Sequence, residues 1–362
     1  MGYMQKQLIV MCNKLIDKLY KTHRLKKEEY LFLIQNREFC KEYLFEKARE
    51  VRDKYYGRNI YIRGLIEFTN ICKNNCLYCG IRKENNNIER YRLTEEEIIK
   101  SCITGYKLGF RTFVLQGGED VFYSDEKLIR IIKTIKKKYP DVAITLSIGE
   151  RSFESYKKLK EAGCDRYLLR HETCIKSHYK KLHPAEMSFD NRIRCLKDLK
   201  KLGYQVGCGF MVGSPFQTDE NLASELLFLK RINPEMCGIG PFISHKDTPF
   251  RNEKTATAEL TVFMLGLIRL TLPKVLLPAT TALGTIDELG REKGINAGAN
   301  VLMPNLSPIA VRKKYMLYDN KICLGDESAQ CIECLKQRMT KTGCKIIVSR
   351  GDNINFKEEK HV

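Results

Sequence analysis

The sequence reads TNICKNNCLYCG at residues 69–80, and this stretch contains three cysteines, Cys72, Cys76 and Cys79, in a CxxxCxxC pattern. The apolar run before it, 60–68, predicts a β-strand, so the cysteines belong to the loop after a strand. Four-iron iron–sulfur clusters normally bind four thiolates, and a compact group of three leaves one iron open to a small molecule. A zinc site is the alternative interpretation, although zinc needs a fourth ligand.

Outward from this stretch, short apolar runs alternate with longer amphipathic stretches. The amphipathic stretches predict helices, and Thr94 with Glu97 three residues later predicts a capping box. The apolar runs predict eight strands, at 60–69, 112–116, 143–148, 167–171, 205–212, 236–242, 276–282 and 300–305. Eight parallel strands with helices between them predict an α/β fold, the (β/α)8 TIM barrel, whose chemistry lies in the loops at the carboxyl ends of the strands.

The periodicity divides the chain into three parts. Residues 1–56 have helical spacing of apolar side chains and predict an N-terminal helical extension. Residues 57–309 form the predicted barrel. Residues 310–362 form a C-terminal segment with a second cysteine group and a basic tail that is expected to fray.

Composition limits the class of protein. The chain has 362 residues, 15 cysteines and a formal net charge of +19. Many thiols without a secretory signal predict a reducing cytoplasm, with the cysteines used for metals or as small buried residues. The basic residues are interleaved with acids and apolar residues, which favours a solvated surface over a nucleic-acid interface. The longest apolar region, 260–286, is interrupted by charged residues and prolines, so no membrane span is predicted.

With Tyr78 before the last cysteine, the CxxxCxxC motif resembles the radical S-adenosylmethionine (SAM) superfamily. This resemblance implies that Cys72, Cys76 and Cys79 are catalytic ligands of a [4Fe-4S] cluster whose open iron chelates SAM. An electron from the cluster, supplied by a donor such as ferredoxin or flavodoxin, then cleaves SAM to a 5'-deoxyadenosyl radical.

Polar and glycine residues follow several predicted strands, where a SAM pocket is expected. The segment Gln116-Gly117-Gly118-Glu119 resembles the superfamily's GGE motif, whose backbone and acid receive the methionine amino group. Glu172 can accept from the ribose or amino group, and Arg192 can pair with the carboxylate. Met211 is a candidate for contact with adenine, although a strand methionine is more often core.

Several longer motifs resemble the HydE family of [FeFe]-hydrogenase maturases over about residues 55–340. They are 165–173, 211–213, 238–242, 278–282 and 299–305. The resemblance implies that Arg166, Thr280 and Thr281 lie in a substrate cavity inside the barrel and that Tyr315 reaches the SAM ribose. The implied role is assembly of the di-iron part of the H-cluster from a small iron–cysteine organometallic substrate, together with other maturases. Gly117 departs from the family, which often has serine there.

Cys323, Cys331 and Cys334 resemble that family's optional second cluster site. Their spacing leaves three readings open: a labile iron–sulfur cluster, a zinc ion with an outside ligand, or no metal. The other nine cysteines have no paired spacing and are interpreted as buried reduced thiols.

Three other classes of function compete with the maturase interpretation. Biotin synthase and methylornithine synthase resemble the chain in fold and first motif, but biotin synthase needs further barrel cysteines for a second cluster, and methylornithine synthase lacks the C-terminal cysteine group. A nucleic-acid-modifying radical enzyme would need an RNA-binding module that the sequence does not contain. A non-enzymatic protein that merely carries clusters would make the SAM-pocket residues a coincidence.

Overall fold

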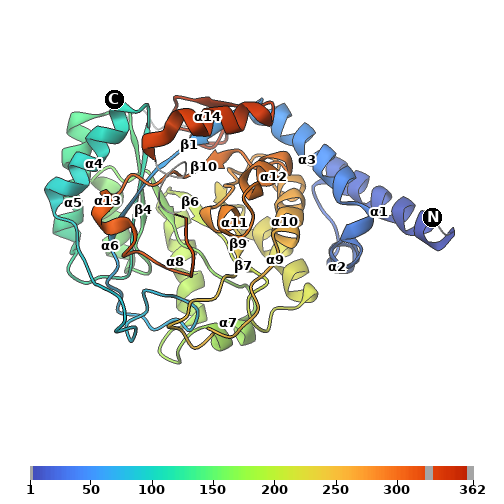
Figure 1. Ribbon diagram of the computed structural model, residues 1–362, viewed down its shortest axis with the longest axis horizontal. Helices are drawn as coiled ribbons and strands as arrows, with labels where there is room; N and C mark the ends of the chain where they lie inside the picture. The colour runs from blue at the N-terminus through green and yellow to red at the C-terminus, as the bar shows by residue number, and fades with distance from the viewer. Residues whose placement is uncertain (1–2, 323–328, 357–362) are drawn as a thin grey trace.

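The computed structural model describes residues 3–322 and 329–356, and its centre is a ring of parallel strands enclosed by helices (Figure 1). The strands are β1 (Asn59–Ile62), β2 (Gly64–Thr69), β3 (Thr112–Gly117), β4 (Ala143–Ser147), β5 (Arg166–Leu168), β6 (Gln205–Cys208), β7 (Met211–Val212), β8 (Met236–Cys237), β9 (Gly240–Pro241), β10 (Val301–Leu302) and β11 (Lys345–Ile347). The helices are α1 (Tyr3–Thr22), α2 (Lys27–Gln35), α3 (Lys41–Tyr56), α4 (Glu95–Lys107), α5 (Asp125–Lys138), α6 (Phe153–Glu161), α7 (Lys176–Leu182), α8 (Phe189–Lys201), α9 (Asp219–Ile232), α10 (Ala258–Thr271), α11 (Thr281–Ile286), α12 (Gly290–Asn296), α13 (Ile309–Arg312) and α14 (Ile332–Lys341).

Parallel pairing closes the ring. Six strands pair in the order β2-β3-β4-β5-β6-β8. Isolated bridges from Leu276 to β8 and from Pro278 to β10 continue the ring, and β10 pairs with β1, which runs directly into β2. The predicted (β/α)8 barrel is therefore confirmed.

The seventh predicted strand, 276–282, is the part of the barrel that differs most from expectation. It forms single bridges at Leu276 and Pro278, and Thr280 then caps α11. Proline has no N–H to donate to a ladder, and the Thr280 hydroxyl accepts from the Leu283 amide, which favours a helix start over a longer strand. The other predicted strands recur, although the first, fifth and sixth are each split into two.

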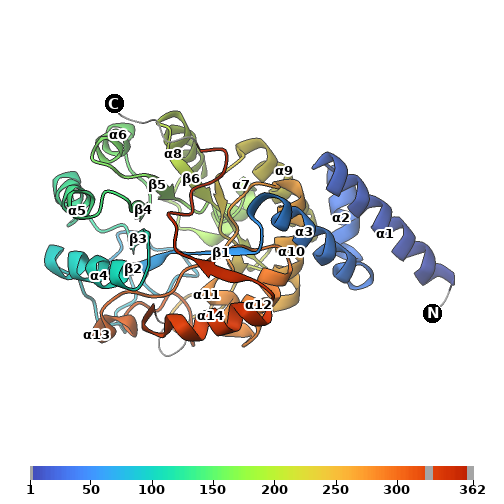
Figure 2. The same cartoon turned by 90° about the horizontal axis from the view of Figure 1, so that it is seen from above.

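The N-terminal helices cover one side of the barrel. α3 packs on α10, α2 packs on α9, and α1 projects outward in both views (Figures 1 and 2). Because α10 lies between the barrel and these helices, every residue from Thr261 to Thr271 is buried. This burial explains the apolar composition of the region, and no helix of the described residues is long and apolar enough to cross a membrane.

The C-terminal segment joins the barrel. β11 pairs in parallel with β1, and the chain beyond it crosses over the amino ends of the strands (Figure 2). There Asp352 contacts Arg166. The expectation of a frayed tail is therefore wrong for residues 345–356, because backbone pairing and buried charges hold them. Residues 357–362 lie outside the described part of the chain.

Candidate active site

The cysteine loop lies between β2 and α4, at the carboxyl end of the barrel. Its backbone is tied to three other segments: the Lys73 amide donates to Glu119 O at 3.0 Å, the Leu77 amide to Leu182 O at 3.0 Å, and the Gly80 amide to Leu317 O at 2.8 Å. From within the loop, the Arg90 guanidinium donates to several of its carbonyl groups. These hydrogen bonds hold the loop backbone at several points.

Cys72, Cys76 and Cys79 face one cavity. Burial raises the pKa of all three thiols, to about 12 for Cys79, and for Cys76 and Cys79 a neighbouring thiolate raises it further. Three thiolates are stable there only beside a strong positive charge, which bound iron supplies. This donor set fits a cluster, in which each thiolate binds a different iron, better than a mononuclear zinc site.

The cavity beside the thiols has a volume of about 280 Å³. Its lining contains all nine residues that the sequence predicted for cofactor binding, and they come from six separate segments of the chain. They are Tyr78, Gln116, Gly117, Gly118, Glu119, Glu172, Arg192, Met211 and Tyr315. The structure thus brings the predicted SAM residues and the three cysteines to a single site at the carboxyl ends of the strands.

The turn after β3 presses against the cysteine loop. A Cβ atom at Gly118 would lie 2.2 Å from Ile71 O, so this approach requires glycine. The next residue, Glu119, donates its amide hydrogen to Cys72 Sγ at 3.4 Å. Its carboxylate accepts from the Glu150 amide at 3.0 Å and lies 3.3 Å from Lys73 Nζ.

Three charged residues of the cavity lining, Arg170, Glu172 and Arg192, take part in ion pairs. Arg192 Nε lies 2.7 Å from Glu150 Oε1, and Arg170 Nη2 lies 3.0 Å from Glu172 Oε2. Neither contact has normal hydrogen-bond geometry, and Arg170 Nε has no hydrogen-bond partner among the described residues. Glu172 also has a left-handed backbone, with φ +64°, a strained conformation of the kind that clusters at functional sites. These groups keep hydrogen-bonding capacity for a polar ligand.

Tyr78 is oriented by a histidine. Burial lowers the pKa of His183 to about 3, so its imidazole is neutral. Since one ring nitrogen, Nδ1, lies 3.0 Å from Tyr179 O and must donate to it, the other, Nε2, accepts from the Tyr78 hydroxyl at 3.2 Å. The aromatic residue of the motif is therefore held against the cavity.

The three predicted substrate residues do not lie together. Thr280 and Thr281 start α11, and the next residue, Ala282, lines the cavity. Arg166 lies at the other end of the barrel, where its guanidinium donates to Thr112 Oγ1 at 2.9 Å and to Asp352 Oδ1 at 2.5 Å. The structure therefore does not place Arg166 beside the two threonines in one substrate cavity.

Several residues of the cavity lining had no predicted role, and two of them have side chains that could bind a polar ligand. Arg170 and Tyr318 both line the cavity. Arg170 was within reach, because it follows Arg166 by four residues in the same quoted motif, and a strand that rises about 3.3 Å per residue carries it about 13 Å toward the carboxyl end. Tyr318 comes from the segment after the barrel, and no local signal in the sequence places it there.

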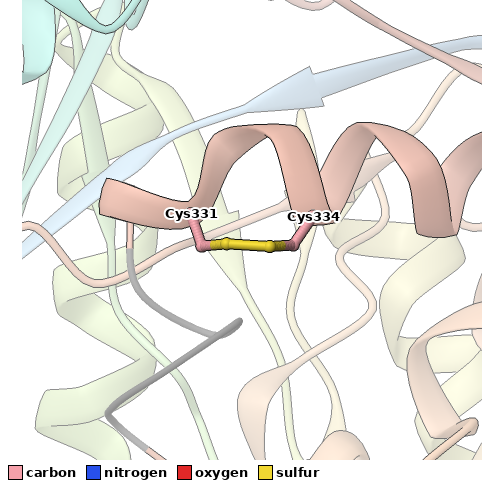
Figure 3. The surroundings of a disulfide bond; sticks show 2 residues. All are labelled: Cys331 and Cys334. Atoms are coloured by element: carbon pink, nitrogen blue, oxygen red, sulfur yellow. A yellow bond between two sulfur atoms is a disulfide. The ribbon is translucent and has the colours of Figure 1, made fainter.

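The second cysteine group is described only in part. Cys323 lies outside the described residues. Cys331 and Cys334 form a disulfide at the start of α14 (Figure 3). Of the other nine cysteines, eight are buried and Cys174 is half-buried.

Comparisons with known proteins agree with this site. The family model for the radical SAM superfamily matches residues 66–229. The "[FeFe] hydrogenase maturase subunit HydE" of Thermotoga maritima is 49% identical over 84% of this chain and 86% of its own length. The 3-methylornithine synthase of Methanosarcina barkeri is 30% identical over 84% of this chain and 85% of its own. A crystal structure of methylornithine synthase superposes with a TM-score of 0.82 at 28% identity, over 92% of this chain and 97% of that one. The cavity, the cysteine loop and the identity to the maturase together place the chain in the HydE family of radical SAM enzymes.

Proposed function

We propose that this chain assembles the di-iron subcluster of the [FeFe]-hydrogenase H-cluster by radical SAM chemistry. The observation that carries the proposal is the convergence of Cys72, Cys76 and Cys79 with the nine predicted SAM residues on one cavity. This chain is 49% identical to a hydrogenase maturase subunit and 30% identical to a methylornithine synthase. The higher identity favours the maturase role.

The three thiolates would hold the [4Fe-4S] cluster, and the cavity next to them would hold SAM. When bound, the cluster supplies the electron that cleaves the sulfonium of SAM to a 5'-deoxyadenosyl radical. Glu119 and the backbone of the preceding glycines receive the methionine amino group, and Arg192 pairs with the carboxylate. Glu172 and Tyr315 bind the ribose, and Met211 packs on the adenine.

The remaining part of the cavity suits a small anionic substrate. The Arg170 guanidinium faces the cavity with unused donors, and Tyr318 adds a hydroxyl group. Thr280 and Thr281 directly precede Ala282, which lines the same cavity. A small iron–cysteine complex presents a carboxylate that such donors bind, and the closed barrel excludes water from the radical. Arg166 has no part in this proposal because its guanidinium forms an ion pair with Asp352.

Biotin synthase is disfavoured by the strand thiols. That enzyme needs cysteines that hold a second cluster inside the barrel. Here Cys208 and Cys237 are neighbours on β6 and β8, both fully buried, and neither lines the cavity. The Cys208 thiol instead contacts the Cys237 thiol and the His171 imidazole.

The decisive experiment is anaerobic iron–sulfur reconstitution followed by EPR spectroscopy with and without SAM. We expect a four-iron signal that changes when SAM is added, together with 5'-deoxyadenosine. Cys76→Ala should abolish both. The matched control is Cys344→Ala, which removes a buried thiol distant in the fold and should leave both intact. A wild-type signal indifferent to SAM would refute the proposal.

For the C-terminal group we propose a second, accessory iron–sulfur site on Cys323, Cys331 and Cys334. The support is their spacing and the adjacency of Cys331 and Cys334, whose Cα atoms are 5.3 Å apart. A reduced, reconstituted protein should contain about eight irons per chain, and a variant with Cys331→Ser and Cys334→Ser about four. Equal iron content in the two proteins would contradict the second site. A cytoplasmic setting, where thiols stay reduced, and partnership with other maturases complete the proposal.

A further inference from the structure

The loop after β3 carries two exposed apolar side chains next to the cysteine site. Val121 is 82% exposed and Phe122 is 44% exposed. Two residues before Val121, the Glu119 amide donates to Cys72 Sγ. Because two extended residues span at most about 7 Å, Val121 lies a short distance from a cluster ligand. One hydrogen bond and a few covalent bonds connect this surface to the sulfur.

The three cysteines are covered by three different segments, and these differ in what they expose. Cys76 Sγ lies 3.5 Å from Met187 Sδ, in the loop after α7. Next to Cys79, the Gly80 amide donates to Leu317 O. Among the described residues of these three covering segments, large exposed apolar side chains occur in the one beside Cys72.

The loop beside Cys72 is rigid. The buried Asp120 carboxylate accepts from Arg92 Nε at 2.7 Å, Arg92 Nη2 at 2.9 Å and Thr69 Oγ1 at 2.8 Å. It also accepts from the Phe122 amide at 3.1 Å. Exposed apolar side chains on a pre-organised loop lose little entropy on binding, which is a property of interfaces more than of mobile loop tips.

Cations surround the apolar pair. The Arg92 guanidinium lies 4.6 Å from the centre of the Phe122 ring, and Lys127 Nζ lies 3.1 Å from it. Lys73 is 55% exposed, whereas the carboxylates of Glu119 and Asp120 are 10% and 1% exposed. The carboxylates of Glu119 and Asp120 are therefore buried beneath the cations, although Glu126, next to Lys127, is exposed.

We propose that Val121, Phe122, Lys73, Arg92 and Lys127 form the docking surface for a small, acidic one-electron carrier protein. This inference rests on the proposed function, because a cluster on Cys72 must receive an electron. The carrier loses one electron, the cluster gains one, and no atom or proton is transferred. Charge complementarity selects the partner: the chain has a net charge of +19, and the cationic rim steers an acidic protein while the apolar centre is desolvated on contact.

A second exposed phenylalanine offers an internal comparison. Phe216 is 54% exposed, and Lys181 Nζ lies 5.0 Å from its ring centre. Its ring packs near Phe250, and no hydrogen bond of the described residues connects it to a cysteine sulfur. It therefore has the same chemistry as the docking surface without the short path to the cluster.

The test uses the reconstituted protein and reduced flavodoxin as the acidic carrier. We would measure the dissociation constant of the complex and the rate of cluster bleaching in the absence of SAM. Val121→Glu places a carboxylate at the centre of the surface, and like charges across an interface should weaken binding and slow donor-driven reduction at least about tenfold. Phe216→Glu should change neither quantity. For the wild type, both should weaken as salt increases.

Dithionite separates this inference from the proposed function. Dithionite-driven SAM cleavage should be equal in the wild type, Val121→Glu and Phe216→Glu. Unchanged flavodoxin binding and reduction in Val121→Glu, or a loss in Phe216→Glu instead, would overturn the docking surface and leave the enzyme assignment intact. Failure of the wild type to cleave SAM with dithionite would overturn the proposed function itself.

Discussion

At the scale of single residues, Arg166 and Arg170 differ by four positions and have opposite roles. The Arg166 guanidinium is 3% exposed and is neutralised by Asp352 at the amino end of the barrel. The Arg170 guanidinium is 34% exposed and lines the cavity. The same side-chain chemistry therefore supports stability at one end of the barrel and ligand binding at the other.

Arg170→Ala tests this division. A hydrogen bond to a charged group contributes about 1.5–3 kcal/mol. Loss of the Arg170 guanidinium should therefore weaken the effect of added substrate on the reaction by about tenfold or more. Formation of 5'-deoxyadenosine without substrate should persist. Arg166→Ala is the matched control and should lower the unfolding midpoint while the substrate response remains. The interpretation fails if the two variants respond to substrate alike.

His171 gives a pH-dependent contribution to stability. Burial disfavours its charged form, but the charge of Glu225, 2.8 Å away, outweighs burial and raises the pKa from 6.5 to about 9. Because the pKa is raised in the fold, this group contributes its full stabilisation below its unfolded-state pKa, and the stabilisation is lost as pH rises through about 9. The difference between the folded and unfolded pKa of His171 corresponds to a stabilisation of about 3 kcal/mol.

Unfolding by denaturant at about pH 6 and about pH 10 measures this contribution. Buried thiols also favour lower pH, so the informative quantity is the difference between the wild type and Glu225→Gln. The variant should lose part of the pH dependence. If the free energy of unfolding changed equally with pH in both proteins, the His171–Glu225 pair would not be charged in the fold.

At the scale of elements, the C-terminal segment closes the amino end of the barrel. Burial raises the pKa of Asp352, but the charge of Arg166 and hydrogen bonds from Gln205 and Arg350 outweigh burial and depress it well below its usual value. The depressed pKa means that this stabilisation is present above the unfolded pKa and is lost as pH falls. The segment is therefore held by charge as well as by the pairing of β11.

Asp352→Asn should destabilise the protein by about 3 kcal/mol, because it leaves a buried arginine without its partner. Glu333→Gln, in α14 of the same segment, breaks an exposed pair with Lys336 and should change stability by less than about 0.5 kcal/mol. Denaturant unfolding near neutral pH measures both. Equal effects would mean that Asp352 is not a buried partner.

At the scale of the whole molecule, we expect the barrel to fold without the cluster. The core is built from strands and helices packed around the ring, and the three cysteines of the loop are only half-buried. Small zinc domains unfold without metal because they lack such a core. This protein has one large enough to fold alone.

Removal of iron with a chelator should therefore leave the far-ultraviolet circular dichroism nearly unchanged. Limited proteolysis should cut within 72–92, and reconstitution should restore protection. Cys76→Ala should show the same cleavage without chelator, and Cys344→Ala should not. Global loss of helicity on chelation would contradict an autonomous barrel.

The sequence by itself determined the alternation of strands and helices, the Thr94 cap and the cysteine motif. The cap recurs with its hydrogen bond to Glu97, and eight strand positions form the ring. These features follow from local patterns of apolar side chains and hydrogen-bonding groups. The positions of most predicted SAM residues follow from the same patterns, because the carboxyl end of a barrel strand is recognisable once the strand is located. Tyr315, which lies beyond the barrel strands, was predicted only from the resemblance to the HydE family.

Tertiary structure alone decided which end of the barrel each arginine occupies, how residues 345–356 close that barrel, and that Tyr318 enters the cavity. It also decided that Val121 and Phe122 stay exposed beside Cys72. Each of these depends on contacts between segments far apart in the chain. The local pattern of apolar residues does not predict such contacts, because the burial of a side chain depends on which distant segments pack against it.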